Sequence, residues 1–593
     1  MLERTLVSPL FRSIGFTALL LASAAPVAAQ VAPSAPTREE ILREPLATPE
    51  TPAQAAIEAD DGIERAPCPL AAPEFSAITL TVRSVSFANA GPIDPALLDP
   101  AWRDLVGTTV PVATICEIRD RAATILRREG YLAAVRVPVQ TIENGDIRLD
   151  ILAAHLTGLQ VRGDAGRSER VLARYLAKLQ NQPLFNVREA ERYLLLAGDI
   201  PGLDARLTLR PGGAAGEVVG EVTVERTPAV VDVNVQNYGA HSAGRWGGIA
   251  RIRVNGITGM GDETSLGVYS VADFDEQHVV QAGHQLRVGG EGLTLSSDLT
   301  YAWSRPTLTG NPPIRSRTLI WSSEARYPLV LRQSRSLWAA GGFDWIDQDV
   351  DIATLPLSQD HLRVGFVRLD GRFVDSAAYA GRSRFGPANP RWAAAFSLEA
   401  RQGIQGLGAS DACGPTGLGC FGPGAIPISH AEADPSALVL RAQAELQFRP
   451  VPAVALVVQP RAQYAADPLL TYEEFSAGNF TVGRGYDPGV ITGDSGIGIS
   501  LEARFDTQTR QRGLSLQPFI FFDGAWVWNE DSGFAGLDPQ KLFSAGGGVH
   551  ITLANRARID LTISEPLRSV GVPPAQPGTR ILASFTMQFG LGR

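Results

Sequence analysis

Charge is the first thing that this 593-residue sequence has little of. Charged residues make up 19% of it, lysine is scarce beside arginine, and the formal net charge is −9. A protein that follows a phosphate backbone needs a basic stripe on its surface, and no segment of the sequence carries one. The composition therefore argues against general nucleic-acid binding.

Long apolar runs are missing beyond the first thirty residues. Arg4 and Arg12 precede an apolar core at 14–25, and the small residues at 27–29 fit a signal-peptidase site. We therefore predict a signal peptide at 1–29 and an exported chain. A transmembrane anchor is the alternative, but the apolar run is short for one. No later run approaches the roughly twenty apolar residues of a membrane-spanning helix, so we expect any membrane span to be a β-barrel.

Motifs for catalysis and for binding metals or nucleotides are also missing. The sequence Gly493-Asp494-Ser495-Gly496 matches part of the trypsin-like nucleophile signature, and Ala153-Ala154-His155 superficially matches its histidine motif. A serine and a histidine must lie within hydrogen-bond reach to act together, and these two segments belong to distant parts of the predicted fold. We therefore assign no catalytic residue, no metal site and no cofactor.

Cysteine is scarce, and four cysteines in an exported chain fit two disulfides. Cys413 and Cys420 enclose a turn-rich stretch of glycine, proline and threonine, which predicts a small disulfide loop. Cys68 and Cys116 would then pair within the first folded domain. Zinc binding is the alternative, but neither pair has the third and fourth ligands that zinc needs.

The segment after the signal peptide, 30–67, is rich in proline, alanine and glutamate, which is typical of a linker. Thr37 and Glu40 form a capping box for one short helix, and Pro45 limits that helix to about two turns. A disordered leader is the alternative for this segment.

Two α+β units are expected next, at 68–156 and 157–227. The first is predicted from a strand, a helix and two strands, at 75–87, 112–129, 133–139 and 146–153. The second is predicted from a strand, two helices and two strands, at 159–163, 167–180, 187–197, 204–210 and 216–224.

Helical periodicity disappears after Thr227-Pro228, and alternating apolar residues take over. We predict sixteen strands, near 229–237, 246–256, 262–272, 277–288, 292–304, 316–327, 336–348, 361–374, 391–404, 436–448, 453–465, 496–506, 514–528, 541–553, 555–565 and 579–589. Stretches of about ten alternating residues are typical of an antiparallel transmembrane barrel. Tight turns such as 259–262 and 553–556 are expected on one rim. Long connections are expected at 349–360, 375–390, 405–434 and 466–494, on the opposite rim.

The predicted strand 514–528 indicates which way its two faces point. Phe521, Asp523 and Ala525 share one face, and the opposite face carries Phe522, Trp526 and Trp528. We expect the tryptophans to face lipid and Asp523 to face the lumen. A soluble β-sandwich would alternate in the same way, but it would not readily explain sixteen strands, an export signal and outward aromatic side chains.

A loop motif stands before this strand, in the long connection 466–494. Arg484 lies between Gly483 and Gly485 and is followed by Tyr486, which suits a loop tip that carries one charge into a narrow space. Asp523, directly after Phe521 and Phe522, is the predicted acidic partner. The planar guanidinium of Arg484 would pair with its carboxylate through two hydrogen bonds.

This combination of loop and strand resembles the conserved pair of two-partner secretion transporters, the TpsB proteins of the ShlB/FhaC type. Gly130-Tyr131 and Val137-Pro138-Val139-Gln140 resemble their first POTRA domain, and Asn237-Tyr238-Gly239 resembles the start of their barrels. The resemblance implies POTRA domains at 68–156 and 157–227 and a barrel at 228–593. It also implies that an N-terminal helix, here 38–44, plugs the lumen.

The resemblance further implies an outer-membrane location with the POTRA domains in the periplasm. The client would be one large TpsA-type exoprotein, similar to a haemolysin or filamentous adhesin, which passes unfolded through the barrel. Contact with outer-membrane lipid is expected, and no nucleic acid or small-molecule cofactor. Two alternatives stay open: an insertase for other barrels and a passive porin.

The sequence departs from the family pattern around the motif. Gly483 stands where the family usually has an apolar residue, and Ala525 follows Asp523-Gly524 where the family usually has Asp-x-Gly. We therefore expect the loop to dock more loosely than usual.

Overall fold

A computed structural model describes residues 35–43, 57–59, 68–180, 182–214, 216–306, 312–379, 384–414, 418–507, 513–531, 538–554, 556–571 and 577–591. All of these residues fall in one compact unit, Ala35–Arg593. The predicted signal peptide at 1–29 lies outside the described residues. Among the residues that are described, no helix is both long enough and apolar enough to cross a membrane.

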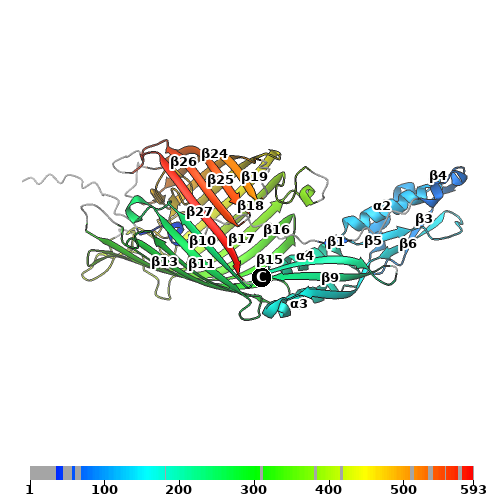
Figure 1. Cartoon of the computed structure of the whole chain (residues 1–593), viewed down its shortest axis with the longest axis horizontal. Helices are drawn as coiled ribbons and strands as arrows, with labels where there is room; N and C mark the ends of the chain where they lie inside the picture. The colour runs from blue at the N-terminus through cyan, green and yellow to red at the C-terminus, as the bar shows by residue number, and fades with distance from the viewer. Residues whose placement is uncertain are drawn as a thin grey trace, which may run out of the picture. The chain divides into compact units, whose positions relative to one another are not determined.

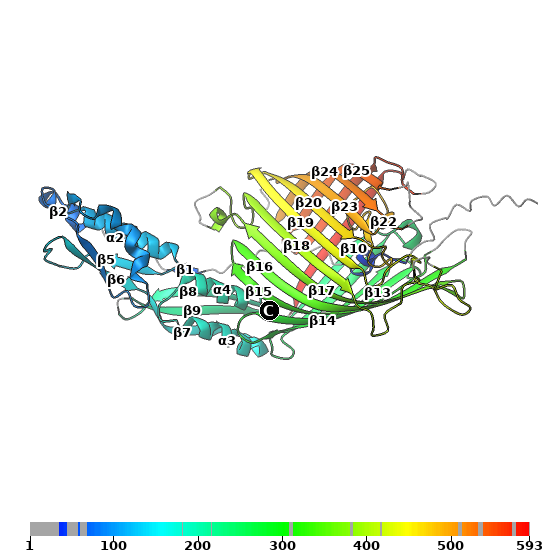
Figure 2. The same cartoon turned by 180° about the vertical axis from the view of Figure 1, so that it is seen from behind.

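The C-terminal part of the chain forms a closed barrel in which each strand pairs with its neighbours in antiparallel fashion (Figures 1 and 2). Its strands are β10 (Ala229–Gln236), β11 (Gly247–Asn255), β12 (Glu263–Val271), β13 (Gln277–Val288), β14 (Leu293–Ser304), β15 (Ile314–Arg332), β16 (Arg335–Ile352), β17 (Leu355–Val374), β18 (Trp392–Gly403), β19 (Leu438–Val451), β20 (Val454–Ala465), β23 (Ser495–Phe505), β24 (Leu514–Trp528), β25 (Gln540–Leu553), β26 (Ala557–Pro566) and β27 (Arg580–Leu591). Each of the sixteen predicted strands is present. The barrel closes where β10 pairs with β27.

Side chains alternate between the inside and the outside of the barrel, as the period of two requires. On β24, Phe521, Asp523 and Ala525 are buried inside, whereas Ile520 and Phe522 are exposed on the outside. The predicted assignment of the two faces of this strand is therefore confirmed. Polar side chains line the interior, and large apolar side chains cover the exterior.

The connections differ from the prediction at two places. We call the barrel end at which β10 begins the near rim and the opposite end the far rim. The predicted long connection at 349–360 is wrong, because β16 and β17 form one long hairpin joined by two residues, with Ile352 paired to Leu355. The alternation simply continues beyond the predicted strand ends, and the carboxylates at 347, 349 and 351 lie within β16. The connection at 375–391 is long, but it lies on the near rim with the tight turns.

The first α+β unit contains β2 (Thr79–Thr81), β3 (Ser84–Ala88), β4 (Thr109–Pro111), α2 (Thr114–Arg128), β5 (Ala133–Arg136) and β6 (Asp146–Ala153), with short 3-10 turns between them. The single strand predicted at 75–87 is wrong. The chain changes partners at Val82 and Arg83, whose N–H groups donate to Thr108 and Gly145. As a result β2 pairs with β4, while β3 pairs in parallel with β6. The predicted helix is confirmed as α2, which packs on the sheet through Ile115, Ile118 and Leu126.

The second α+β unit contains β7 (His155–Gly163), α3 (Glu169–Gln180), α4 (Val187–Gly198), β8 (Leu203–Pro211) and β9 (Glu217–Arg226). Each predicted element is present within a few residues. Its sheet also has a fourth strand that was not predicted, because β1 (Ile57–Ala59) from the leader pairs in parallel with β8. The leader therefore covers one edge of this sheet.

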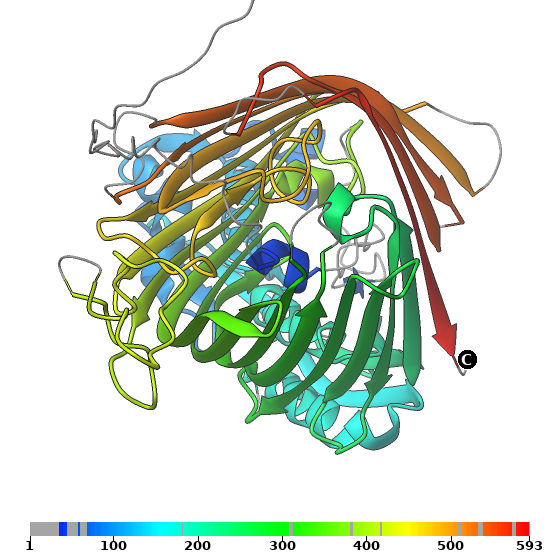
Figure 3. The same cartoon turned by 90° about the vertical axis from the view of Figure 1, so that its left-hand side faces the viewer.

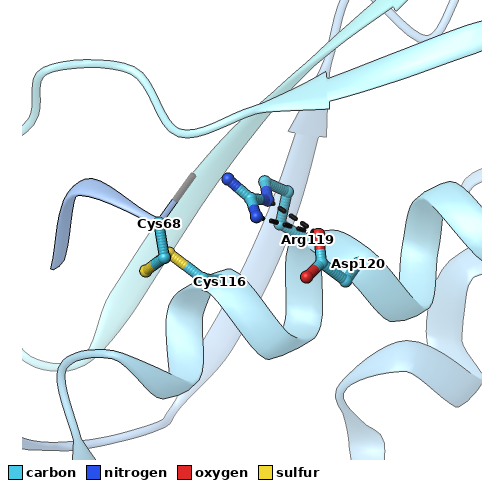
Figure 4. The surroundings of a disulfide bond; sticks show 4 residues. All are labelled: Cys68, Cys116, Arg119 and Asp120. Carbon is cyan, nitrogen blue, oxygen red and sulfur yellow. Dashed lines mark hydrogen bonds and ion pairs between the residues drawn. A yellow bond between two sulfur atoms is a disulfide. The ribbon is translucent and has the colours of Figure 1, made fainter. Parts of the chain in front are cut away.

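Both predicted disulfides are confirmed. Cys68 bonds to Cys116 with their Cα atoms 5.9 Å apart, and Cys413 bonds to Cys420 with a Cα separation of 5.0 Å. Cys116 lies in the first turn of α2, where the guanidinium of Arg119 pairs with the neighbouring Asp120 at 2.9 Å (Figure 4). The first disulfide therefore fastens the start of the first unit to its only long helix among the described residues.

Candidate functional site

The long connection between β20 and β23, 466–494, folds against the inside of the barrel. Its short strands β21 (Phe475–Ala477) and β22 (Ile491–Gly493) pair with each other and give it a fixed base. Buried apolar side chains then pack this connection, which we call the lumen loop, on β24 and β25. They are Phe475, Val482, Tyr486 and Ile491 on the loop, and Ala525, Val527 and Leu542 on the wall.

The tip of the lumen loop approaches the wall closely on both sides of Arg484. Gly483 has a φ of +122°, and a Cβ added to it would lie 2.7 Å from Leu542 Cδ1. A Cβ on Gly485 would lie 2.8 Å from Ser544 Cβ and 3.0 Å from the backbone nitrogen of Pro566. Only glycine fits such contacts without displacing the wall or the loop. At Gly483 the loop tip therefore lies in close contact with the wall.

Arg484 and Asp523 come together as the sequence indicates. The Nε of Arg484 donates to Oδ2 of Asp523 at 3.0 Å, and Nη2 donates to Oδ1 at 2.9 Å. The backbone N–H of Arg484 donates to the same carboxylate at 3.0 Å. Asp523 is 1% exposed, so its carboxylate is shielded from water. The carboxylate thus fixes both the side chain and the backbone of the loop tip.

Strand β23 supplies two further partners that the sequence analysis missed. Arg484 Nη1 donates to Oε2 of Glu502 at 2.8 Å, and Nη2 donates to the hydroxyl of Ser500 at 2.9 Å. Ser500 in turn donates to Asp523 at 2.8 Å. Both residues belong to the inward face of β23, and Ser500 stands directly opposite Asp523 in the register. The sequence signal that could have identified these partners is the inward carboxylate of Glu502, on the strand next to that of Asp523.

Phe521 contacts the ion pair, and Tyr486 anchors the neighbouring part of the loop to the wall. The guanidinium carbon of Arg484 lies 3.6 Å from the centre of the Phe521 ring, a cation–π contact. Tyr486 is fully buried, and its hydroxyl lies 2.8 Å from the carbonyl oxygens of Phe543 and Arg568. The predicted supporting residues therefore all touch the loop tip or its immediate wall.

The charges around Arg484 favour its cationic form. Burial acts to lower the pKa of the guanidinium, but hydrogen bonds and charge from Asp523 and Glu502 outweigh burial and raise the pKa above its usual value. The site therefore holds one permanent cation between two carboxylates. Removing one partner from such a buried pair typically costs about 3–5 kcal/mol, because the other charge is left uncompensated.

The opposite end of the lumen loop has a second ionic anchor, which the sequence analysis also missed. Glu473 is buried and accepts hydrogen bonds from Arg401 on β18, at 2.8 and 3.1 Å, and from Arg441 on β19. Arg401 also donates to Asp344 on β16 at 2.9 Å. Burial acts to raise the pKa of Glu473, but the two arginines outweigh burial and hold the pKa far below its usual range.

A single helical turn from the leader lies inside the barrel (Figure 3). Helix α1 (Arg38–Ile41) has the predicted capping box between Thr37 and Glu40, but it is one turn long instead of two. Its Ile41 is fully buried among inward side chains of the wall, and Glu39 pairs with Arg461 on β20 at 3.3 Å. A cavity of about 630 Å³ remains beside it, lined in part by Arg38, Glu39 and arginines of the wall.

The leader also touches the lumen loop, just after helix α1. The guanidinium of Arg43 is stacked between Tyr269 on β12 and Phe480 on the loop, at 4.0 and 4.6 Å from the two ring centres. Arg43 Nη2 donates to Gln277 at 2.9 Å. The leader, the loop and the wall thus form one packed assembly in the lumen.

The trypsin-like signature has a structural role. The hydroxyl of Ser495 donates to the carbonyl of Ala465 at 3.1 Å, across the base of the lumen loop. His155 begins β7 in the second α+β unit. In the described part of the chain, no three side chains of His, Cys, Asp or Glu are placed to hold a metal ion.

Two segments of the chain match known families. Residues 80–153 match the ShlB-type POTRA domain, and residues 385–551 match the haemolysin secretion/activation proteins ShlB, FhaC and HecB. The second match contains the lumen loop and Asp523. A curated relative is the heme/hemopexin transporter protein HuxB of Haemophilus influenzae strain 86-028NP, 26% identical over 171 residues. That alignment covers 28% of this chain and 30% of HuxB, so the chain matches less than a third of the relative's length.

Solved structures resemble most of the chain. CdiB from Escherichia coli superposes with a TM-score of 0.70 at 16% identity, covering 89% of this chain and 95% of CdiB. CdiB from Acinetobacter baumannii superposes with a TM-score of 0.62 at 14% identity, covering 86% and 90%. At these identities the likeness establishes the fold.

Proposed function

We infer that this chain, which belongs to the TpsB family of two-partner secretion transporters, carries a secreted partner protein through its barrel. The observation that supports this most directly is the docked lumen loop. Arg484 is held by Asp523 and Glu502 inside a closed barrel, where a strand-like client would have to pass.

The barrel would span the outer membrane, with the α+β units in the periplasm. Support comes from the exterior of the wall, where large side chains such as Ile520, Ile581 and Tyr464 are exposed. Apolar exteriors of this kind face lipid in outer-membrane barrels. The near rim, from which the second unit continues into β10, would then face the periplasm.

The client would be one large exoprotein, similar to a haemolysin or a filamentous adhesin, that arrives unfolded. POTRA-like sheets offer edges to which an extended client can add as a strand, and backbone hydrogen bonds then supply affinity. No nucleotide-binding motif occurs in the sequence, so folding of the client outside the cell would give the transport its direction. The chain's own part is to bind and conduct the client, and we assign it no catalysis.

The lumen as it stands is obstructed, and transport would require it to open. Helix α1, the lumen loop and Arg43 between them occupy the space that the client needs. We therefore assign the plug to the single turn Arg38–Ile41, held chiefly by Glu39 and Arg43. Arg484 and Asp523 would fix the resting position of the loop.

The test compares proteins released into the medium by cells with and without this gene, together with their outer-membrane profile. Loss of one large exoprotein with an unchanged membrane profile is expected. Depletion of many membrane barrels would instead favour the insertase, and no change in either would favour the porin.

The same assay tests the ion pair. Arg484→Ala and Asp523→Ala are each expected to abolish export of the client while leaving barrel insertion intact, because each leaves a buried charge without its partner. Arg317→Ala is the matched control, since its ion pair with Asp351 is partly exposed. Normal export from both lumen variants would refute the role given to the pair.

A further inference from the structure

The two ends of the barrel sheet meet at a seam between β10 and β27. The seam has eight registered pairs, from Ala229↔Leu591 to Gln236↔Ser584, whereas the β16–β17 hairpin has eighteen. The seam is therefore among the shorter junctions of the wall, and it has few backbone hydrogen bonds. At its far-rim end, β10 continues into the connection 237–246, and the connection 567–579 leads into β27.

One carboxylate of the lumen loop contacts both sides of this far-rim end. Asp487 Oδ1 lies 2.7 Å from Nη1 of Arg580, the first residue of β27. The same oxygen lies 3.6 Å from Nη1 of Arg245, and Oδ2 accepts the backbone N–H of His241 at 3.3 Å. Arg245 and His241 belong to the connection that follows β10. Asp487 therefore bridges the two strands that close the barrel.

Arg580 depends on this carboxylate. Its side chain is 6% exposed, and it points into the lumen beneath the loop. Among the described residues, Asp487 is the one acidic side chain in ion-pair range of it, and none of its three guanidinium nitrogens makes a hydrogen bond there. Without Asp487 the guanidinium would be a buried, uncompensated charge at the end of the seam, which is strongly unfavourable.

The same loop that holds Asp487 is locked to the other part of the wall by Arg484, three residues earlier. Additional contacts tie it to the β10 side, since Asn479 Nδ2 donates to the carbonyl of Tyr238 at 3.1 Å. The rings of Phe480 and Tyr238 meet edge to face with centres 6.2 Å apart. Between Asn479 and Asp487 the loop thus spans the inside of the wall from β23 to the seam.

We propose that Asp487 is a positioning residue that clasps the far-rim end of the seam, so that the resting position of the lumen loop and the closure of β10 on β27 depend on each other. When the loop leaves Asp523, Asp487 leaves Arg580, and the uncompensated guanidinium loosens the last pairs of the seam. This inference rests on the proposed transport function for its purpose, because a looser seam widens the far rim while a client passes.

The test is amide hydrogen exchange on the purified full-length protein in lipid nanodiscs, without any client. In Asp487→Ala, the seam amides at 234–236 and 581–586 are expected to exchange on the order of tenfold faster than in the unaltered protein, since local opening follows local stability. Amides of the β16–β17 hairpin are expected to be unchanged. Asp351→Ala, which removes a partly exposed ion pair between β15 and β16, is the matched control and should leave the seam protected.

A second variant separates the clasp from general damage to the wall. Arg580→Met removes the buried charge, so adding Asp487→Ala to it should produce little further exchange at the seam, as expected when two residues act through one contact. Unchanged seam exchange in Asp487→Ala, or equal acceleration with and without Arg580→Met, would overturn the clasp. The measurement uses no client, so its result does not depend on whether the secretion proposal is correct. Conversely, a negative result for the clasp would not affect the secretion proposal, which is tested by export of the client from the unaltered protein.

Discussion

The lumen loop is anchored at two places that differ in how their charges are shared. At the tip, Arg484 lies between Asp523 and Glu502, and Asp523 has no second cation in ion-pair range among the described residues. At the base, Glu473 pairs with Arg401 and Arg441, and Arg401 is also paired with Asp344 and Glu399. Loss of Arg484 leaves Asp523 without a cation, whereas loss of Glu473 leaves Arg401 with two carboxylates. The comparison suggests that the tip is the sensitive element and the base is the robust one.

The largest expected effect is at the tip, and it tests directly whether the two anchors differ. Arg484→Ala should destabilise docking of the loop tip by about 3–5 kcal/mol, because Asp523 stays buried and loses the one cation in ion-pair range of it in the described part of the chain. Glu473→Gln should destabilise the base by a smaller amount, on the order of 1–3 kcal/mol, because Arg401 keeps Asp344 and Glu399. Amide exchange over 471–477 and 482–486 measures both. An equal or larger effect for Glu473→Gln would show that the two anchors are not different in kind.

A steric change tests the docking of the tip alone. Gly485→Ala places a methyl group 2.8 Å from Ser544 Cβ and 3.0 Å from Pro566 N, so the tip or the wall must shift. Overpacking of this kind typically costs about 1–3 kcal/mol, and we expect faster exchange at 482–486 with the base unaffected. Gly578→Ala is the control, because nothing lies within 4 Å of the added methyl group. Equal exchange in the two variants would mean that the tip has room that the contacts do not indicate.

The remaining expected effect is a pH dependence at the base. Burial raises the pKa of Glu474 to about 7, and the nearby carboxylates of Asp494 and Asp531 act in the same direction. A glutamate in an open chain titrates near about 4.3, so the docked loop binds the proton more tightly than the released loop. Docking is therefore most stable below about pH 4 and weakens as the pH rises through about 7.

Glu474→Gln should remove this pH dependence, since the amide stays neutral. The measurement is exchange at 471–477 between pH 5 and pH 8, corrected for the intrinsic rate at each pH. A loop that docks more firmly as the pH rises, or a variant with the same slope as the unaltered protein, would contradict the assignment to Glu474.

The tip of the loop could be predicted from the sequence because its signals are local. Two glycines flank Arg484, and the alternation of β24 alone decides that Asp523 faces the lumen. The capping box of Thr37 and Glu40 is local in the same sense, and α1 begins where it indicates. Disulfide pairing also followed from the spacing of four cysteines.

The base of the loop could not be predicted because its partners are brought together by the register of the barrel. Glu473, Arg401 and Arg441 belong to separate segments of the chain. No sequence pattern indicates which inward residues of β18 and β19 the register makes neighbours. Strand β1 was missed for a related reason, since three residues pair with a distant edge strand and carry no alternation of their own. The broken strand at 75–87 shows the same limit, because the change of partner at Val82 depends on Thr108 and Gly145.

The Cys413–Cys420 disulfide makes the long far-rim connection a natural place to carry added sequence. The Cα atoms of the two cysteines are held 5.0 Å apart. A segment inserted between them therefore begins and ends at fixed points and does not strain β18 or β19. Leu418 is well exposed within the small loop, and exposed loop tips accept insertions best. An epitope or a fluorophore-binding tag placed after Leu418 would thus be displayed on the far rim.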